Sequence, residues 1–435
     1  MVPPNKTIMC AIEKWDSLLN ATLPNGCSPS WYMIEKGQLD YPMTIGEYMT
    51  KSHIGNDVGL RNLVTPPLKN VVYREKSELY GSQYLYLIPI FQVEYFHKNK
   101  DIGFSMFSAE MLKDIRDGKC KIVLIQDTEG MSGVASYVAK DDFIVLNDWC
   151  TKSNIPHESV YYMSANLKSR ELAKDQGCQV NVIPVTVQEM WVNYFQFPAT
   201  PIEYIPVDKK VYLNYSRRPR QHRVLLSSEL IRHKLFDSGV NSFNTCDQVF
   251  PHWNFPVDDP ELLEIGRALW NGGPIFIDRQ TDTDDIAVYM RPLDYEQTFL
   301  SLVTETIFEP ETLFMSEKTW KPISIGHPFV IIGSPGCLKY LHEQGFKTFD
   351  RWIDESYDSI IDVHERIKHV VNELKKFNAM SIDELSAIRI EMLEVLTHNK
   401  AVMKKRVTSK YFYGSEFSMR KPIEDELVKI WASFK

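Results

Sequence analysis

One short segment of the chain combines the residue types that bind a phosphorylated sugar. It reads Ser-Glu-Lys-Thr-Trp-Lys over 316–321 and stands just ahead of the apolar run 328–333. A carboxylate accepts hydrogen bonds from sugar hydroxyls, and ammonium groups are point charges for phosphate oxygens. Because one turn before a buried strand would present them together, the segment predicts a phosphate and ribose site. Its expected contact residues are Ser316, Glu317, Lys318, Thr319 and Lys321.

A second, more basic cluster lies between a predicted strand and the helix predicted to follow it. Such a turn presents unpaired backbone N–H groups and the positive end of a helix to an anion, and guanidinium groups add bidentate contacts. The alternative is a solvated charged turn, because charged residues are mostly exposed. The segment at 316–321 favours binding, and the residues expected to contact the ligand are Asn214, Arg217, Arg218, Arg220, His222 and Arg223.

The first half of the chain alternates short apolar runs with amphipathic stretches. Strands are predicted over 84–93, 121–126, 142–147, 159–164 and 179–184, and helices over 106–117 and 167–176. This alternation is typical of a parallel sheet with crossover helices, which binds ligands at the carboxyl ends of its strands. Three carboxylates follow those predicted strands, namely Asp127, Glu129 and Asp148.

A proline-rich segment over 197–206 can continue neither a helix nor a central strand, so we expect a domain boundary between residues 205 and 206. Beyond it the alternation restarts. Strands are predicted over 210–215, 274–278, 300–305, 329–332 and 347–349, with helices over 222–236, 362–377, 381–406 and after Pro422. Ser381 and Glu384 have the spacing of a helix capping box. The expected fold is α/β, with two Rossmann-like domains facing a cleft and terminal helices closing the chain.

The two charged clusters together resemble the nucleotide-sugar half of a two-Rossmann (GT-B) glycosyltransferase. The Ser316-Glu317-Lys318 motif with its apolar run is similar to the Thr/Ser-Glu-Lys element of α-1,3-fucosyltransferases and exostosin-like enzymes. This resemblance implies that Glu317 holds the ribose hydroxyls and Lys318 a diphosphate oxygen. The pattern over roughly 205–370 also resembles that of phage-encoded glycosyltransferases, DNA-modifying enzymes among them, through 213–223, the Ser316 motif and 345–358.

The resemblance also implies which domain binds the donor and which binds the acceptor. A domain over 206–435 would bind a UDP- or GDP-sugar, and a domain over 1–205 would bind the acceptor. Basic side chains would stabilise the departing nucleoside diphosphate in place of a metal, so no cofactor is expected. Fucosyltransferases follow Glu-Lys with an aliphatic residue and an Arg-Asn pair, whereas this chain continues Thr-Trp-Lys-Pro, which leaves the donor base and sugar open.

Transfer of a sugar requires a base that deprotonates the acceptor hydroxyl. Asp127 and Glu129 are the first candidates, because they follow a strand whose loop would face the cleft, and Asp148 is the second. The alternative is a turn rich in Asp and Gly because turns favour those residues.

Several donor-side positions have two interpretations. Trp320 either stacks on the base or belongs to the core. Tyr357 and Glu355 are candidates for contact with donor hydroxyls, whereas Asp358 reads as a helix cap. The DxD in Asp282-Thr-Asp284 is a metal-binding pattern that arises easily by chance, and we expect no metal.

The composition and charge of the chain limit the kinds of partner and compartment that we expect. The chain has 435 residues, 44% of them hydrophobic, and a net charge of −8, so no global basic field would hold nucleic acid non-specifically. Its 7 scattered cysteines include no CxxC pair and predict free thiols in a reducing compartment. The sequence shows neither a signal-peptide pattern nor an apolar stretch of the ~18 residues that span a membrane. We therefore expect a cytoplasmic protein, in the host cytoplasm if it is phage-encoded.

The sequence bears on three classes of function. The leading prediction is a nucleotide-sugar-dependent glycosyltransferase, with a hydroxymethylated pyrimidine in phage DNA or else a glycan, protein or small molecule as acceptor. The alternative is a non-catalytic module that binds a phosphorylated ligand or nucleic acid. A phage structural protein would be fibrous or β-rich, which the α/β alternation opposes. The oligomeric state stays open.

Overall fold

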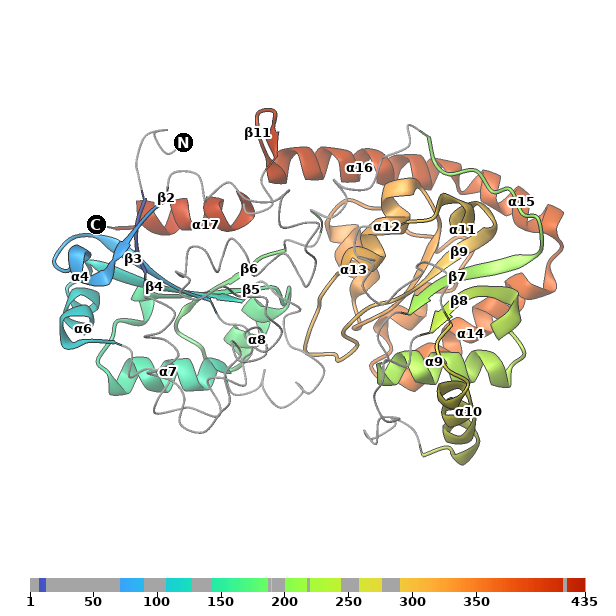
Figure 1. Cartoon of the computed structure of the whole chain (residues 1–435), viewed down its shortest axis with the longest axis horizontal. Coiled ribbons are helices and arrows are strands. Elements are labelled where there is room, and N and C mark those ends of the chain that lie inside the picture. Colours follow the sequence, from blue (N-terminus) through green and yellow to red (C-terminus); the bar gives the residue numbers. More distant parts are fainter. Residues whose placement is uncertain are drawn as a thin grey trace. The chain divides into compact units, whose positions relative to one another are not determined.

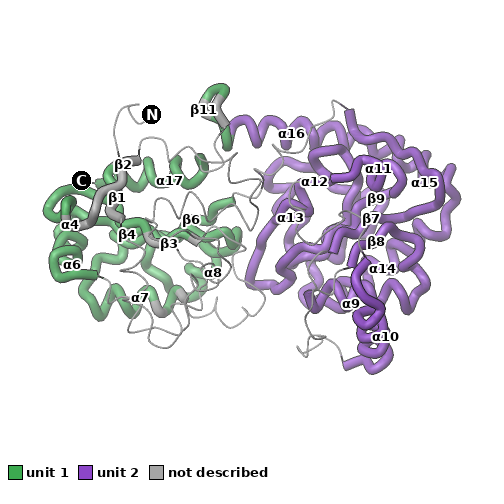
Figure 2. The backbone as a smooth tube through the Cα atoms, viewed as in Figure 1, with its two compact units in different colours: residues 1–187, 410–435 green, residues 188–409 purple. Residues whose placement is uncertain are grey.

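The protein folds into two compact units, comprising residues 1–187 with 410–435, and residues 188–409 (Figure 2). The computed structural model describes residues 8–12, 71–89, 107–126, 142–186, 189, 200–216, 220–243, 258–275, 290–417 and 421–434. No helix among them is long and apolar enough to span a membrane.

The first unit contains a six-stranded parallel sheet with the order β2-β1-β3-β4-β5-β6. Its strands are β1 (Ile8–Ile12), β2 (Val71–Glu75), β3 (Tyr84–Pro89), β4 (Cys120–Gln126), β5 (Val160–Ser164) and β6 (Asn181–Pro184). The predicted parallel α/β architecture is therefore confirmed. The order reverses direction at β1, as in doubly wound sheets.

Helices cover both faces of this sheet (Figure 1). They are α4 (Lys76–Leu79), α6 (Ala109–Arg116), α7 (Asp142–Lys152), α8 (Ser169–Asp175) and α17 (Lys421–Ala432), with a 3-10 turn η3 (His157–Ser159). Because side chains alternate along a strand, Tyr84 and Tyr86 pack with α6 and α7, whereas Leu85 and Leu87 pack against Leu427 of α17. Both faces are thus buried, as expected of a parallel sheet.

Two local predictions in this unit have different outcomes. The helix expected over 106–117 is confirmed: the Ser108 hydroxyl caps it by accepting from the Met111 amide at 3.2 Å, and Gly118 follows with φ 71°. The strand expected over 142–147 is wrong, because these residues form the first half of α7. A short apolar run suits a buried strand or a helix equally well, and here it covers the sheet instead of joining it.

The second unit contains a four-stranded parallel sheet with the order β10-β9-β7-β8. Its strands are β7 (Lys210–Ser216), β8 (Gly239–Phe243), β9 (Thr298–Thr304) and β10 (Phe329–Ile332). Helices α9 (Gln221–Arg232) and α14 (Val363–Ala379) lie together on one face, and α11 (Pro292–Glu296) and α12 (Glu317–Ile325) on the other (Figure 1). The remaining elements are η5 (Phe236–Ser238), α10 (Pro260–Asn271), α13 (Cys337–Glu343), η6 (Glu355–Ser359), α15 (Ile382–Glu391), α16 (Leu393–Tyr411) and the hairpin β11 (Phe412–Tyr413) and β12 (Glu416–Phe417).

The strand expected over 347–349 is wrong. The backbone of Lys347 pairs with the side chain of Asn399 instead, which accepts from its N–H and donates to its C=O, both at 2.8 Å. Of the strand expected over 274–278, Ile275 forms an isolated bridge with Phe243, and 276–278 lie outside the described residues. The Ser381–Glu384 capping box is confirmed, although the helix it begins is divided into α15 and α16.

The units differ from the division expected at residues 205 and 206. The described part of the proline-rich segment belongs to the second unit, because the Ile202 N–H donates to Ile325 O and the Ile205 N–H to Glu296 O, both at 2.8 Å. Helix α17 instead returns to the first unit, where Ile423, Leu427 and Ile430 bury the second face of the sheet.

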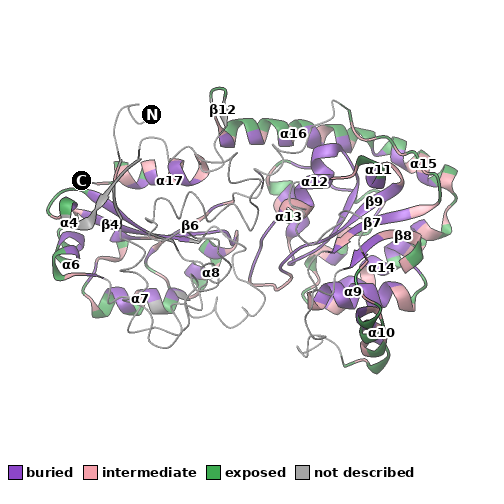
Figure 3. Ribbon diagram, in the orientation of Figure 1, coloured by how far each residue is buried: buried purple, intermediate pink, exposed green. Residues whose placement is uncertain are grey.

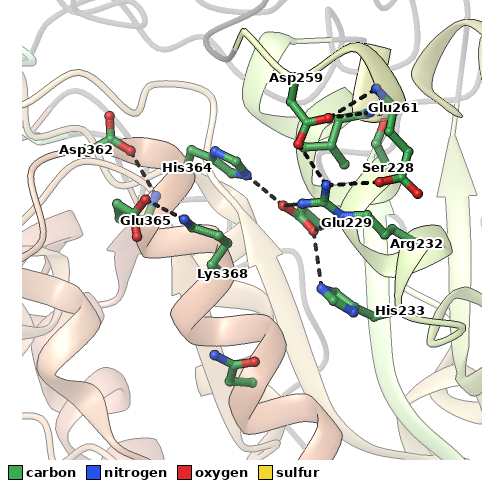
Figure 4. A network of polar contacts seen from close by, with 12 residues as sticks. Ser228, Glu229, Arg232, His233, Asp259, Glu261, Asp362, His364, Glu365 and Lys368 are labelled. Atoms are coloured by element: carbon green, nitrogen blue, oxygen red, sulfur yellow. Dashed lines mark hydrogen bonds and ion pairs between the residues drawn. The ribbon is translucent and has the colours of Figure 1, made fainter. Parts of the chain in front are cut away.

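A buried ion network fastens α9 to its neighbours (Figure 4). Glu229 is fully buried and accepts two hydrogen bonds from Arg232, at 2.6 and 3.1 Å. His364 of α14 lies 2.6 Å from the same carboxylate, and Arg232 also reaches Asp259, the N-cap of α10, at 2.8 Å. These contacts hold α9, α10 and α14 as one layer.

Candidate nucleotide-binding site

The second sheet reverses its strand order between β7 and β9, and open α/β sheets bind ligands outside the carboxyl ends of their strands at such a point. Polar residues occupy this place. The hydroxyls of Ser216, at the end of β7, and Thr304, at the end of β9, lie 3.2 Å apart. Glu305 follows directly and is fully buried.

The Glu305 carboxylate is bonded by neutral donors from the beginning of α12. Its Oε1 accepts from the Ser316 N–H at 3.1 Å and the Thr319 hydroxyl at 2.6 Å. Its Oε2 accepts from the Thr306 N–H at 3.3 Å. Burial raises the pKa of this carboxyl, although Lys318 and these hydrogen bonds oppose the rise.

The backbone carbonyl of Glu305 is bonded from the beginning of α9. His222 Nε2 lies 2.8 Å from it, and Arg223 Nη2 donates to it at 3.2 Å and to Thr304 O at 2.9 Å. Burial and the neighbouring Arg223 hold the pKa of His222 well below its usual range. The neutral ring therefore donates from Nε2. Glu305 thus connects the α9 start (Arg220–Arg223) with the α12 start (Ser316–Thr319).

The segment expected to form a turn at 316–321 is the beginning of a helix. Ser316 is the N-cap, and its hydroxyl accepts from the Lys318 N–H at 3.3 Å. The side chains of Glu317 and Lys318 form an ion pair at 2.6 Å and are 14% and 17% exposed. Burial alone would raise the pKa of Glu317, but Lys318 and Lys321 lower it below its ordinary value. A partly exposed carboxylate and ammonium group therefore lie together at a helix N-terminus, which attracts anions.

The other end of α12 is held by two buried cations. Lys400 donates to Ser324 O at 2.9 Å, and Arg389 donates to Phe299 O at 2.8 Å and lies 3.5 Å from Gly326 O. Burial lowers the pKa of Lys400 to about 8 and that of Arg389 to about 9. Positive charge at a helix C-terminus stabilises the helix. Figure 3 shows α12 buried along nearly its whole length, so the α12 start has a rigid base.

Gly326 lets another segment approach this end of α12 closely. Its φ of 74° is the left-handed region, and a Cβ there would lie 2.7 Å from Pro201 Cα. The residue therefore ends the helix and admits the proline-rich segment at the same point.

Several predicted ligand contacts lie in the interior. Asn214 is 1% exposed, and its carboxamide bonds to Asn241 and to Ser216 within the sheet. Thr319 is fully buried and bonded to Glu305, and Lys321 is 5% exposed. These buried side chains hold the backbone of the site in place and do not face solvent.

Two aromatic residues that the sequence left open also belong to the core. Trp320 is fully buried, packs 5.9 Å from Phe346 by ring centroids, and donates to Met315 O at 3.3 Å. Tyr357 is 1% exposed and its hydroxyl accepts from the Ile331 N–H at 3.2 Å. The core interpretation of Trp320 is confirmed. Tyr357 lies in the interior and bonds to the backbone of β10.

The remaining predicted residues belong to the first unit, to the α9 start, or to the part of the chain that the structure does not describe. Asp148 occupies an exposed position on α7 in the first unit. Arg220 is the N-cap residue of α9 and half-buried. The residues outside the described part of the chain are Asp127, Glu129, Arg217, Arg218, Asp282 and Asp284.

The structure adds two residues that the sequence did not single out for binding, Glu305 and Ser334. Ser334 follows β10 and is 2% exposed, and its hydroxyl has no partner among the described residues. It adjoins Gly333, where a Cβ would lie 3.1 Å from Glu305 Cβ. A buried hydroxyl without a partner is unfavourable unless a water or a ligand bonds to it. A polar residue at or just beyond the carboxyl end of a strand was the available signal.

One group of metal-ligand side chains occurs in the described part of the chain. The ligand atoms of Asp354, His369 and Glu373 lie within 4.8 Å of one another. They are already bonded internally: His369 lies 3.2 Å from the Asp354 carboxylate, and Lys376 donates to Glu373 at 2.5 Å. These bonds account for the group without an ion.

No protein-family model and no curated protein matches the sequence. The chain is similar to several solved structures. One is a mutant of T4 phage BGT in complex with UDP-glucose, which is 11% identical, with a TM-score of 0.32 over 85% of this chain and 87% of that one. T4 phage BGT with its UDP-glucose substrate is 10% identical, with a TM-score of 0.32 over 84% and 88% of the two chains. The DNA-modifying enzyme β-glucosyltransferase, with and without uridine diphosphoglucose, is 11% identical, with a TM-score of 0.33 over 84% and 88%. Likenesses this low carry no weight for function.

Proposed function

We propose that the protein is a glycosyltransferase that moves a sugar from a nucleoside-diphosphate sugar to an acceptor hydroxyl. One observation carries the proposal. Two charged segments more than 90 residues apart, each expected from its residue types to bind phosphate, meet on Glu305 at the carboxyl end of β9. Their meeting point is the strand-order reversal, where such sheets bind ligands.

The proposed donor-side roles belong to the partly exposed Glu317 and Lys318 and, on the sequence, to the arginines before and at the beginning of α9. The Glu317 carboxylate accepts from the ribose hydroxyls, and Lys318 bonds to a diphosphate oxygen, as the resemblance of the Ser316 motif implies. Arg217, Arg218 and Arg220 add positive charge at the α9 start. Stabilising the leaving diphosphate by fixed cations lowers the barrier to transfer without a metal ion.

The acceptor and its base belong to the first half of the chain in this proposal. Asp127 or Glu129, with Asp148 as second choice, deprotonates the acceptor hydroxyl. The acceptor is a hydroxymethylated pyrimidine in DNA, or else a glycan or protein.

A thermal-shift screen with UDP, GDP, CMP, ADP and their sugars tests the donor side. A ligand at 100 times its dissociation constant adds about 2.7 kcal/mol to the free energy of unfolding, so one nucleotide should give a clear shift. That donor is then incubated with DNA containing or lacking hydroxymethylated cytosine, and nucleoside diphosphate release is measured. Binding without release on any acceptor tested would indicate the non-catalytic module. A screen without any shift would contradict the proposal.

A further inference from the structure

Two separate segments depend on one residue at the proposed site. The Glu305 side chain bonds to Ser316 and Thr319 at the α12 start, and its backbone carbonyl bonds to His222 and Arg223 at the α9 start. Glu305 itself is fully buried. Neither start can shift without loosening a bond to this residue.

Close packing around Glu305 leaves little room for adjustment. Gly333 faces it so closely that a Cβ would lie 3.1 Å from Glu305 Cβ and 3.1 Å from Cys337 Sγ. Phe308 also packs against His222, with ring centroids 4.6 Å apart and planes tilted by 41°. Packed interiors shift between discrete arrangements and do not deform continuously.

We propose that Glu305 is a positioning residue that joins the α9 start and the α12 start into one cooperative unit. A shift or loosening of the backbone at either start then loosens the other start as well. This inference rests on the proposed function for its ligand, but the coupling itself is a property of the protein alone. Ligand contacts at the α12 start would then order the α9 start in advance, and the reverse must hold to the same extent.

Amide hydrogen exchange on the full chain tests the coupling. Thr319→Val removes the hydroxyl that donates to Glu305 and keeps the side-chain shape, whereas Thr319→Ser keeps the hydroxyl. Loss of a hydrogen bond to a charged group corresponds to roughly ten- to hundredfold in an opening equilibrium. We expect Thr319→Val to speed exchange about tenfold at the Ser316 amide and also at Arg223 and Val224 of α9, and Thr319→Ser to resemble the wild type.

Thr298→Val is the matched control. Thr298 is also fully buried, and its hydroxyl donates at 2.6 Å, here to Asp294 O. It lies at the opposite end of β9, roughly 20 Å from Thr304 at about 3.3 Å per residue. Exchange at both charged starts should keep wild-type rates in this variant.

The reverse experiment uses Arg223→Met, which removes the bonds to Thr304 O and Glu305 O. It should speed exchange of the Ser316 amide, whose hydrogen bond goes to the Glu305 carboxylate. Should either variant fold poorly, Glu305→Gln retains the shape and one acceptor oxygen, and it should loosen both starts together. Exchange that changes only at the start bearing the substitution would overturn the inference.

A ligand arm separates this inference from the proposed function. UDP, GDP or inorganic pyrophosphate added to the wild type should slow exchange at both starts. If none of them changes exchange anywhere, the proposed function fails, while the variants still decide whether the starts are coupled. If a ligand protects one start alone, the proposed function stands and the coupling is refuted.

Discussion

Two fully buried carboxylates in the second unit, Glu305 and Glu229, have opposite surroundings. Glu229 receives its hydrogen bonds from Arg232 and lies against His364. The charge of this carboxylate is therefore matched by cationic or titratable side chains of the protein itself. Glu305 receives its hydrogen bonds from two amides and a hydroxyl. Lys318, whose charge acts on the Glu305 carboxyl, pairs instead with Glu317 at the partly exposed helix start.

This difference distinguishes a carboxylate with a structural role from one at a ligand-binding site. Where charge is matched inside the protein, as at Glu229, the carboxylate joins helices and no charge remains for a ligand. Where neutral donors satisfy the carboxylate, as at Glu305, Lys318 pairs with Glu317 instead, and both side chains stay partly exposed, where a ligand can reach them. Substitutions at the two places should therefore fail in different ways.

The largest effect is expected at Glu229. Glu229→Ala removes two hydrogen bonds from Arg232, which keeps Asp259 as a partner. Hydrogen bonds to charged groups contribute about 1.5–3 kcal/mol each, so the loss should be roughly 3–5 kcal/mol. Urea denaturation should show this loss, while nucleotide affinity of the folded protein stays unchanged. His233→Ala is the matched control, because His233 is 34% exposed and 3.5 Å from Glu229, and it should cost under about 1 kcal/mol. Equal losses in the two variants would remove the contrast.

A third carboxylate sharpens the comparison through pH. Glu355 accepts from the Thr348 hydroxyl at 2.5 Å and the Phe349 N–H at 2.6 Å, and burial raises its pKa from the ordinary 4.5 to about 7. Between those values the folded state keeps a proton that the unfolded state loses, so the free energy of unfolding falls as pH rises. At 1.36 kcal/mol per pKa unit the loss is about 3 kcal/mol across this window.

Glu355→Gln should remove that pH dependence. The measurement is urea denaturation of both proteins at intervals from pH 4.5 to 7.5, read as the difference between them. Parallel curves would show that burial does not raise the pKa of this carboxyl.

The third prediction concerns Glu317 and the ribose. Its carboxylate should favour UDP or GDP over the 2′-deoxy nucleotide, and Glu317→Gln should reduce that preference about tenfold, since hydrogen bonds to charged groups contribute about 1.5–3 kcal/mol. Competition binding of the two nucleotides gives the ratio. Inorganic pyrophosphate, which has no ribose, is the control ligand, and the substitution should not weaken its binding. An unchanged ratio would remove the ribose role.

The smallest effect is expected at Ser334. Removing a buried hydroxyl that lacks a partner should leave the ligand-free protein as stable or more stable, by up to about 1 kcal/mol. If the hydroxyl bonds to the ligand, Ser334→Ala should weaken nucleotide binding by a factor of roughly 3–10. A loss of stability without a loss of affinity would assign Ser334 a purely structural role.

The sequence predicted the architecture well where local pattern determines it. The apolar runs of β4, β7, β9 and β10 and the capping box at Ser381 are confirmed. The run 142–147 failed because its length suits a helix or a strand. The run 347–349 failed because the backbone of Lys347 pairs with Asn399, 52 residues further on.

For the candidate site, the sequence identified the charged segments but not the residue that joins them. Glu305 bonds to residues more than 80 positions before it and about 10 after it, and no local pattern encodes such contacts. For the same reason Asn214 and Tyr357, which look like ligand contacts in the sequence, lie in the interior. Burial of a polar side chain is set by tertiary packing.

Calorimetric titration of the wild type and of Lys318→Met with UDP and GDP tests the central claim most directly. The account predicts that one nucleotide binds the wild type, more weakly at higher salt, and that Lys318→Met loses roughly ten- to hundredfold in affinity without a change in melting temperature. Equal dissociation constants for the two proteins, or no binding of either nucleotide to the wild type, would contradict it.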